Sequence, residues 1–183
     1  MNFLKSSCLC IAINIVGCAY SPAPYQVVDS LPYKHGYMAG FYKTGVTEEV
    51  VKAKHYYKIT VKLDKGSSKS RAESMLLFHS AKLAQQNGST GFTIKKIRNT
   101  VWCGYSSNEG KAPYVANSGP FSSAFITLIQ PTTPAKMLNR KTYRTAETIT
   151  QNEHTVLQGE SKQDAKFNQK ANNEACSARL NNA

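Results

Sequence analysis

Acidic side chains are scarce in this chain of 183 residues, which has 11 aspartates and glutamates against 23 lysines and arginines. The two adjacent carboxylates, Glu48 and Glu49, would point to opposite faces of a strand and so cannot form an acid–base pair. The spacing of the histidines makes neither an H-x-x-x-H nor an H-x-x-E-H zinc motif. They are His35, His55, His79 and His154. No G-x-S-x-G or Walker sequence occurs. We therefore expect no enzyme activity, no metal site and no cofactor.

The chain also lacks a hydrophobic run long enough to cross a bilayer, which requires about 20 predominantly apolar residues. The run near the amino terminus extends only from Cys8 to Val16, and Asn14 interrupts it. Lys5 precedes the run, and small residues follow it. A basic start, a short apolar segment and a small-residue exit are typical of a secretory signal peptide. We predict that residues 1–17 form this signal peptide.

The end of that segment resembles the lipobox of bacterial lipoproteins, in the order Ile15, Val16, Gly17 and Cys18. The resemblance implies that cleavage precedes Cys18, that its thiol takes a diacylglyceryl group and that the freed amine is acylated. Two or more acyl chains anchor a protein stably. Ala19 lacks the carboxylate associated with inner-membrane retention, so the resemblance implies the periplasmic face of the outer membrane. A secreted protein without lipid is the alternative.

Two of the five cysteines remain once Cys8 and Cys10 leave with the signal peptide and Cys18 carries lipid. An exported chain reaches an oxidising compartment, which would permit a disulfide between Cys103 and Cys176. Connectivity cannot be read from sequence, so paired and free thiols both stay open. Cys103 is also the sole candidate thiol nucleophile, and the sequence places no histidine beside it.

Composition divides the rest of the chain into three parts. Residues 18–35 carry three prolines and little periodicity, which predicts an extended membrane tether. Residues 36–152 contain the patterned apolar segments and predict the folded domain. Residues 153–183 are rich in Asn, Gln, Lys and Ala and have almost no hydrophobic pattern. We predict that they form a polar tail that is disordered or loosely helical.

Within the domain, alternation predicts a half-buried strand over residues 55–63 and a more central strand over residues 121–130. A further strand is expected from residue 91, with a bulge near Lys95–Lys96. A loop is expected over residues 106–120, and residues 142–152 are ambiguous between a short helix and an edge strand. These patterns predict an α+β fold of three or more mostly antiparallel strands with one main amphipathic helix packed on the sheet.

That helix is predicted over residues 67–87, with a serine cap at its start and Gly88 as its stop. Small and aliphatic residues share one face at 100° per residue. They are Ala72, Leu76, Leu77, Ser80, Ala81, Leu83 and Ala84. Arg71 and Lys82 are expected to face away. Met75 and Phe78 lie off the stripe, and packing or a contact surface would explain them.

This order of elements resembles a family of small, uncharacterised bacterial lipoproteins first named from Caulobacter open reading frames. The resemblance covers about 38 residues well, from Tyr57 to Ile94, and about 110 loosely. The matching positions are Tyr57, Arg71, Ala72, Leu77, Ala81, Leu83, Gly88, Phe92 and Ile94. The family implies a lipid-anchored α+β protein and supplies no catalytic residue. The Trp102–Cys103 pair and the long tail depart from its pattern.

The net charge of +12 is the main physical indication of function. Lys95, Lys96 and Arg98 lie together, and a second basic cluster comprises Lys136, Arg140, Lys141 and Arg144. A basic surface concentrates anionic partners, although the same charge would also aid solubility. We expect a membrane-anchored lipoprotein with a structural or interaction role. The alternative is a binding module for an anionic envelope polymer such as peptidoglycan or lipopolysaccharide. The other partners considered are the membrane, through the lipid, and an envelope protein; nucleic acid is not expected.

Overall fold

The computed structural model of the chain describes residues 24–29, 43–51, 55–130 and 141–182. The predicted signal peptide and lipobox lie outside the described residues. So do part of the predicted tether and two members of the second basic cluster, Lys136 and Arg140.

Five strands form one sheet in the order β1-β2-β4-β3-β5, and every neighbouring pair is antiparallel. The strands are β1 (Gly45–Val50), β2 (Tyr56–Lys62), β3 (Gly91–Ser106), β4 (Tyr114–Leu128) and β5 (Thr142–Arg144). The strand predicted to be central is β4, which pairs with β2 on one side and β3 on the other. Together with a helix packed on the sheet, this confirms the α+β prediction.

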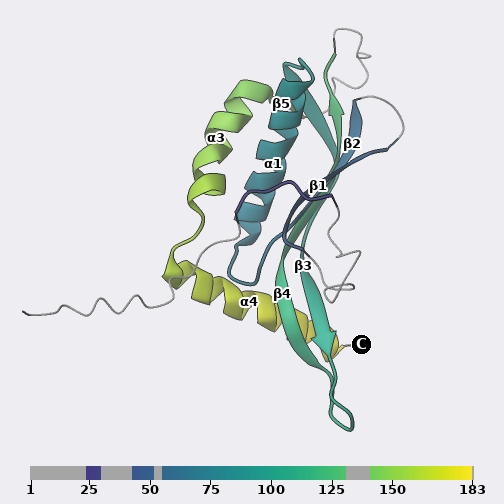
Figure 1. Cartoon of the computed structure of the whole chain (residues 1–183), viewed down its shortest axis with the longest axis vertical. Coiled ribbons are helices and arrows are strands. Elements are labelled where there is room, and N and C mark those ends of the chain that lie inside the picture. The colour runs from purple at the N-terminus through teal and green to yellow at the C-terminus, as the bar shows by residue number, and fades with distance from the viewer. Residues whose placement is uncertain (1–23, 30–42, 52–54, 131–140, 183) are drawn as a thin grey trace, which may run out of the picture.

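Helix α1 (Lys69–Gln86) lies along one face of the sheet (Figure 1). It begins at Ser68, whose hydroxyl accepts a hydrogen bond from the Arg71 N–H at 3.1 Å. It ends before Gly88, which has a φ of +66° that suits glycine. Met75 and Phe78 are both buried, so packing explains the two residues outside the predicted stripe.

Two further helices lie on the same side of the sheet. Helix α3 (Thr145–Gln158) packs against α1, which therefore lies between α3 and the strands (Figure 1). Helix α4 (Lys162–Leu180) crosses the other end of β3 and β4. Within the residues that the structure describes, no helix combines the length and the apolar character needed to cross a membrane.

The buried position of α1 between two layers corrects the prediction for Arg71. Its guanidinium is 2% exposed, lies 3.4 Å from a Glu160 carboxylate oxygen and donates to the Val156 carbonyl at 3.1 Å. Glu160 also accepts the Ser68 N–H at 2.7 Å. A buried guanidinium needs an ionic partner and several acceptors, and the turn after α3 supplies them.

For the tail, the disordered alternative is wrong, because residues 153–182 are largely helical, and they are packed on the domain instead of being loose. Ala165, Asn172 and Cys176 of α4 are buried. The Asn172 amide donates to the Lys65 and Ser67 carbonyls at 2.9 and 3.1 Å, and Cys176 is joined to Cys103. Polar bonds and a covalent link thus replace the apolar area whose absence led to the prediction.

Residues 24–29, predicted to belong to a free tether, are also held on the domain. Val28 N–H donates to the Val46 carbonyl at 2.8 Å, and Val46 N–H donates to the Gln26 carbonyl at 2.9 Å. The Tyr25 ring packs edge-on against Phe78, with centroids 5.2 Å apart. The predicted tether is therefore wrong for these six residues, since a strand edge and a helix face bind them.

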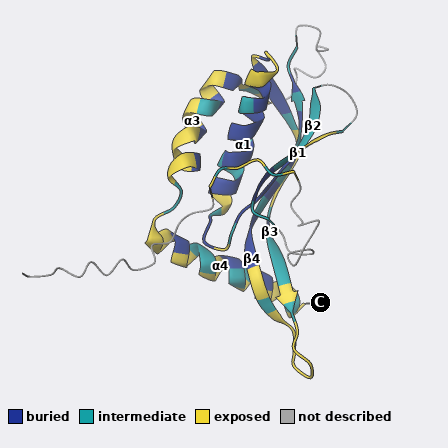
Figure 2. Ribbon diagram, in the orientation of Figure 1, coloured by how far each residue is buried: buried dark blue, intermediate teal, exposed yellow. Residues whose placement is uncertain are grey.

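The predicted loop over residues 106–120 is mostly strand. β4 begins at Tyr114 and pairs with β3 almost to the tip of a long hairpin, whose end is exposed (Figure 2). Asn117, Ser118, Gly119 and Pro120 lie within the predicted loop, and pairing with β3 holds them in β4. The ambiguous segment over residues 142–152 is both alternatives in turn: β5 followed directly by α3.

Candidate anion-binding site

The face of the sheet opposite α1 carries none of the described helices, and we call it the helix-free face. Register places matching positions of three strands on it. They are Tyr56, Lys58, Thr60 and Lys62 of β2, Phe121, Ser123, Phe125 and Thr127 of β4, and Thr93, Lys95, Arg98, Thr100 and Trp102 of β3. The face thus combines basic and aromatic side chains, unlike the aliphatic face beneath α1.

A β-bulge brings two of the predicted basic residues onto this face. Residues three apart on a regular strand point to opposite sides, but Lys95 pairs with Phe125 and Arg98 pairs with Ser123. Lys96 and Ile97 of β3 together lie opposite the single β4 residue between Ser123 and Phe125, and Lys96 has a φ of +54°. The predicted bulge is confirmed. It places the Lys95 and Arg98 side chains side by side, with Lys96 exposed between them.

The Trp102 indole crosses the sheet beside this basic cluster. Its N–H donates to the Leu63 carbonyl at 2.8 Å, so the ring passes over the neighbouring strand at Gly119. A Cβ at Gly119 would lie 2.2 Å from that carbonyl oxygen and 2.7 Å from the indole nitrogen, so only glycine fits. The Lys62 ammonium lies 3.6 Å from the centroid of a Trp102 ring, a cation–π distance.

A groove of about 390 Å³ opens where the helix-free face meets the edge of β3. Two guanidinium groups, Arg98 and Arg179, lie at this groove together with the rings of Trp102, Tyr105 and Phe121. Arg179 comes from the last turn of α4 and donates to the Val101 carbonyl at 2.6 Å and to the Thr100 hydroxyl at 2.8 Å. These bonds fix its position at the groove.

The disulfide between Cys103 and Cys176 places α4 there, with an S–S distance of 2.05 Å. The sequence left paired and free thiols as alternatives, and in the structure the two cysteines are paired. Tyr105 O–H donates to the Cys176 carbonyl at 3.1 Å, and the Ser118 hydroxyl donates to the Asn173 side-chain oxygen at 2.6 Å. The Cys103 sulfur is bonded to its partner, so it is not available as a thiol nucleophile in this structure.

The electrostatics of the groove favour anions. None of its lining residues is acidic, and Arg98 makes no ion pair with any residue that the structure describes. On β1, Glu49 pairs with Lys58 of the helix-free face at 3.5 Å. Burial lowers the pKa of Lys62 to about 8, so this side chain still carries most of its charge at pH 7. Two guanidinium groups can bind carboxylate or phosphate oxygens in pairs.

The remaining predicted basic residues lie elsewhere. Arg144 is in β5 opposite Gly91, at the far end of β3 from the groove, and Lys141 lies over the Tyr143 ring at 5.1 Å. Sequence reasoning missed Arg179, which it assigned to the tail. One signal could have found it. Arg179 lies one helical turn after Cys176, so a disulfide from Cys176 to Cys103 would bring Arg179 close to β3.

Sequence reasoning also missed a buried hydrogen-bond chain around His79. His79 is 5% exposed. Its Nε2 lies 3.0 Å from a Glu48 carboxylate oxygen and its Nδ1 lies 2.8 Å from the Tyr25 hydroxyl. Because the carboxylate only accepts, Nε2–H donates to Glu48 and Nδ1 accepts from Tyr25. Burial lowers the pKa of His79, while the hydrogen bond that it donates to Glu48 and the Glu48 charge act to raise it. Burial, together with the Glu48 charge, raises the pKa of Tyr25.

This chain ties the amino-terminal segment to α1 and β1. With both ring nitrogens occupied and the ring buried, we assign it a structural role. In the described part of the chain, no three His, Cys, Asp or Glu side chains gather as metal ligands. Comparisons of the sequence and structure with protein families, with curated proteins and with solved structures find no match.

Proposed function

We propose that this chain is a lipid-anchored protein of the cell envelope that acts by binding, and that the groove at the β3 edge binds an anionic envelope polymer. The lipobox at Cys18 supports the anchor. The observation that carries the binding role is the convergence of Arg98 and Arg179 with aromatic rings in a groove without acidic residues. Lys95 and Lys96 extend the positive charge along the sheet.

The chemistry of the groove indicates the kind of polymer. Guanidinium groups pair with carboxylates or phosphates, whereas the apolar surfaces of Trp102 and Phe121 suit the uncharged parts of a chain molecule. Peptidoglycan offers carboxylates and lipopolysaccharide offers phosphates. A groove that opens along an edge strand lets a polymer enter and leave at both ends.

Binding is tested by pull-down of the chain on purified peptidoglycan and on lipopolysaccharide at low and high salt. Charge reversal at the bulge should weaken binding at low salt by about tenfold or more, because anion attraction depends on local potential. The variant is Lys95→Glu, Lys96→Glu and Arg98→Glu in one chain. Unchanged binding to both polymers would exclude the groove as their site.

A matched control changes the net charge equally at exposed or half-exposed positions away from the groove, on α1 and at the hairpin tip. It carries Lys69→Glu, Lys82→Glu and Lys111→Glu. This variant should keep most of the binding. An equal loss in both variants would mean that net charge, and not the groove, attracts the polymer.

Anchoring is tested separately by labelling cells with radioactive palmitate. The wild-type chain should take up label, and Cys18→Ser should abolish it. Label that persists in Cys18→Ser would exclude the lipobox as the acylation site and leave the polymer test unaffected.

A further inference from the structure

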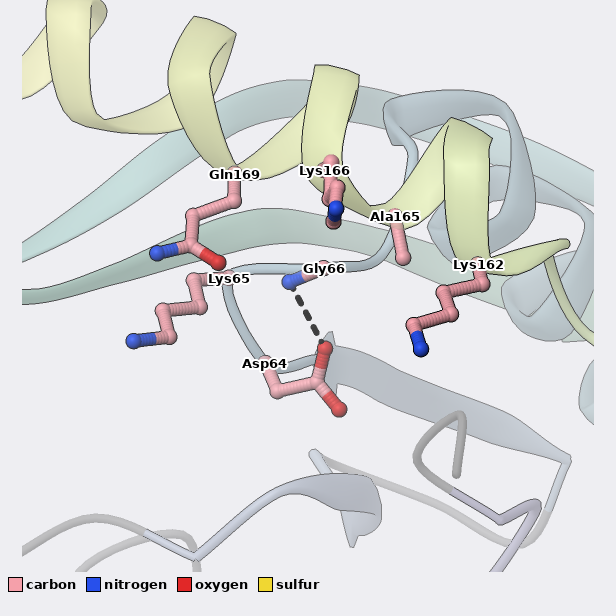
Figure 3. A pocket seen from close by; sticks show the side chains of 7 residues that line it. All are labelled: Asp64, Lys65, Gly66, Lys162, Ala165, Lys166 and Gln169. Carbon is pink, nitrogen blue, oxygen red and sulfur yellow. Dashed lines mark hydrogen bonds between the residues drawn. The ribbon is translucent and has the colours of Figure 1, made fainter. Parts of the chain in front are cut away.

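A second basic cavity lies on the other side of α4, where the helix begins. It has a volume of about 370 Å³ and lies between the turn after β2 and the first turns of α4 (Figure 3). Its lining residues are Asp64, Lys65, Gly66, Lys162, Ala165, Lys166 and Gln169. We call it the lysine pocket.

The walls of the lysine pocket are fixed by hydrogen bonds between α4 and the turn. Asn168 donates to the Gly66 carbonyl at 3.1 Å, and Asn172 holds the carbonyls on either side. The Asp64 carboxylate accepts the Gly66 N–H at 2.9 Å and the Ser67 hydroxyl at 3.2 Å (Figure 3). The one acidic residue of the pocket is therefore engaged in shaping the turn.

The lysines of the pocket are exposed and make no ion pair with a described residue. Lys65 extends from the turn, and Lys162 and Lys166 lie one helical turn apart on α4 (Figure 3). Lys170 continues the row by another turn and lies 3.9 Å from Glu174. Of the acids near the start of α4, Asp164 accepts from the Ser161 hydroxyl at 2.6 Å, and Glu160 pairs with the buried Arg71. The lining of the pocket holds three lysines against one acid, which suits phosphate groups.

Two large apolar side chains are exposed at the same end. Phe167 follows Lys166 on the outer side of α4 and is 72% exposed, and Leu157 in the last turn of α3 is 61% exposed. An exposed aromatic ring beside lysines can enter the surface of a bilayer while the lysines meet the headgroups. A soluble phosphate compound would give Phe167 no such contact.

The covalent geometry of the chain would bring the domain close to a bilayer. Because Tyr25 is bound to α1, the held segment begins at Pro24, only six residues after Cys18. Six extended residues span about 20 Å. A lipid on Cys18 would therefore keep the domain within about one molecular radius of the membrane, and not on a long spacer.

We infer that the lysine pocket and Phe167 form a docking surface for the anionic bilayer, with lipid phosphates at Lys65, Lys162 and Lys166. The orientation toward the cell membrane rests on the proposed lipid anchor, but the affinity of the surface does not. Docking on this side leaves the β3 edge groove, at the other end of α4, free to bind a polymer.

The test is co-sedimentation of the Cys18→Ser chain with vesicles of phosphatidylcholine alone or with 30% phosphatidylglycerol. The chain should bind the anionic vesicles, and a Lys162→Gln/Lys166→Gln variant should bind them about thirtyfold more weakly, since each lysine near an anionic surface contributes about 1 kcal/mol. Phe167→Ser should weaken binding about fivefold or more. These side chains are exposed, and an unchanged melting temperature would verify that the variants fold.

Lys95→Gln/Lys96→Gln is the matched control, because it removes the same charge at the other basic site. It should lower polymer binding and leave vesicle binding within about threefold of the parent. If the two double-lysine variants lost vesicle binding equally, net charge would explain the binding, and the proposed docking surface would be wrong. Full vesicle binding by Phe167→Ser would overturn the bilayer as the occupant. Failure of the polymer pull-down alone would overturn the proposed function and not this surface.

Discussion

The two ends of the sheet are covered by helices in different ways. At the α1 end, buried aliphatic and aromatic residues such as Ile59, Leu76 and Phe92 fill the space between helix and strands. At the α4 end, the helix buries only Ala165, Asn172 and Cys176, and it is held by amide hydrogen bonds, Arg179 and a disulfide. One attachment rests on the hydrophobic effect. The other rests on directed polar bonds that have little effect unless each partner is in place.

The largest predicted effect separates two phenylalanines, one from each end. Phe92→Ala should lower the free energy of unfolding by about 4 kcal/mol, because Phe92 is fully buried and stacks on Tyr143 at 5.2 Å. Phe167→Ala should change it by less than about 0.5 kcal/mol, since Phe167 is on the surface. Urea denaturation of both variants measures the difference, and equal effects would contradict the assigned burial.

Removal of the disulfide should destabilise the α4 end of the sheet more than the α1 end. Cys103→Ala/Cys176→Ala is expected to lower the free energy of unfolding by about 3 kcal/mol, because the bond closes a loop of 73 residues. Hydrogen exchange should show the loss first in α4, whose apolar contacts are few, while α1 keeps its protection.

The control for that exchange experiment is Phe92→Ala, which weakens the other end. It should speed exchange in α1 and the strands together. A disulfide-free variant in which α1 and α4 lose protection to the same degree would mean that the domain unfolds as one unit.

The asparagines of α4 give a finer test of the polar attachment. Asn172→Ala leaves the Lys65 and Ser67 carbonyls without their side-chain donor and should cost about 2 kcal/mol. Asn168→Ala removes a single bond to Gly66 and should cost about 1 kcal/mol. Thermal melts followed by circular dichroism would rank the two, and a larger loss for Asn168 would contradict the arrangement.

The same contrast explains how far the sequence predicted the fold. The α1 end follows from periodicity: strict alternation in β2 and a helical stripe from Ala72 onward predicted its core. The α4 end has no apolar period, so residues 153–183 resembled a disordered tail. Its stability comes from pairings between distant residues, such as Arg179 with Val101, that no local pattern encodes.

The candidate site divides in a similar way. The broken alternation of β3 predicted the bulge, and the cluster of Lys95, Lys96 and Arg98 was visible in one short segment. The groove itself needed Arg179 and the crossing of Trp102 over Gly119, which depend on the long hairpin and the disulfide. A charge cluster can be found from sequence, but the cavity beside it requires the tertiary contacts that enclose it.

The smallest predicted effect concerns the His79 chain, which holds the amino-terminal segment at the α1 end. Burial keeps the pKa of His79 in the folded protein below its ordinary value of about 6.5. Below that pH the unfolded chain takes up a proton that the folded protein resists, so stability present above it is lost as the pH falls.

The melting temperature of wild type should therefore decrease from pH 7.5 to 5.5 more steeply than that of His79→Gln. The exposed His154→Gln should follow wild type across the range. Parallel curves for wild type and His79→Gln would mean that this imidazole titrates alike in both states. Burial of the ring would then not favour its neutral form in the folded protein.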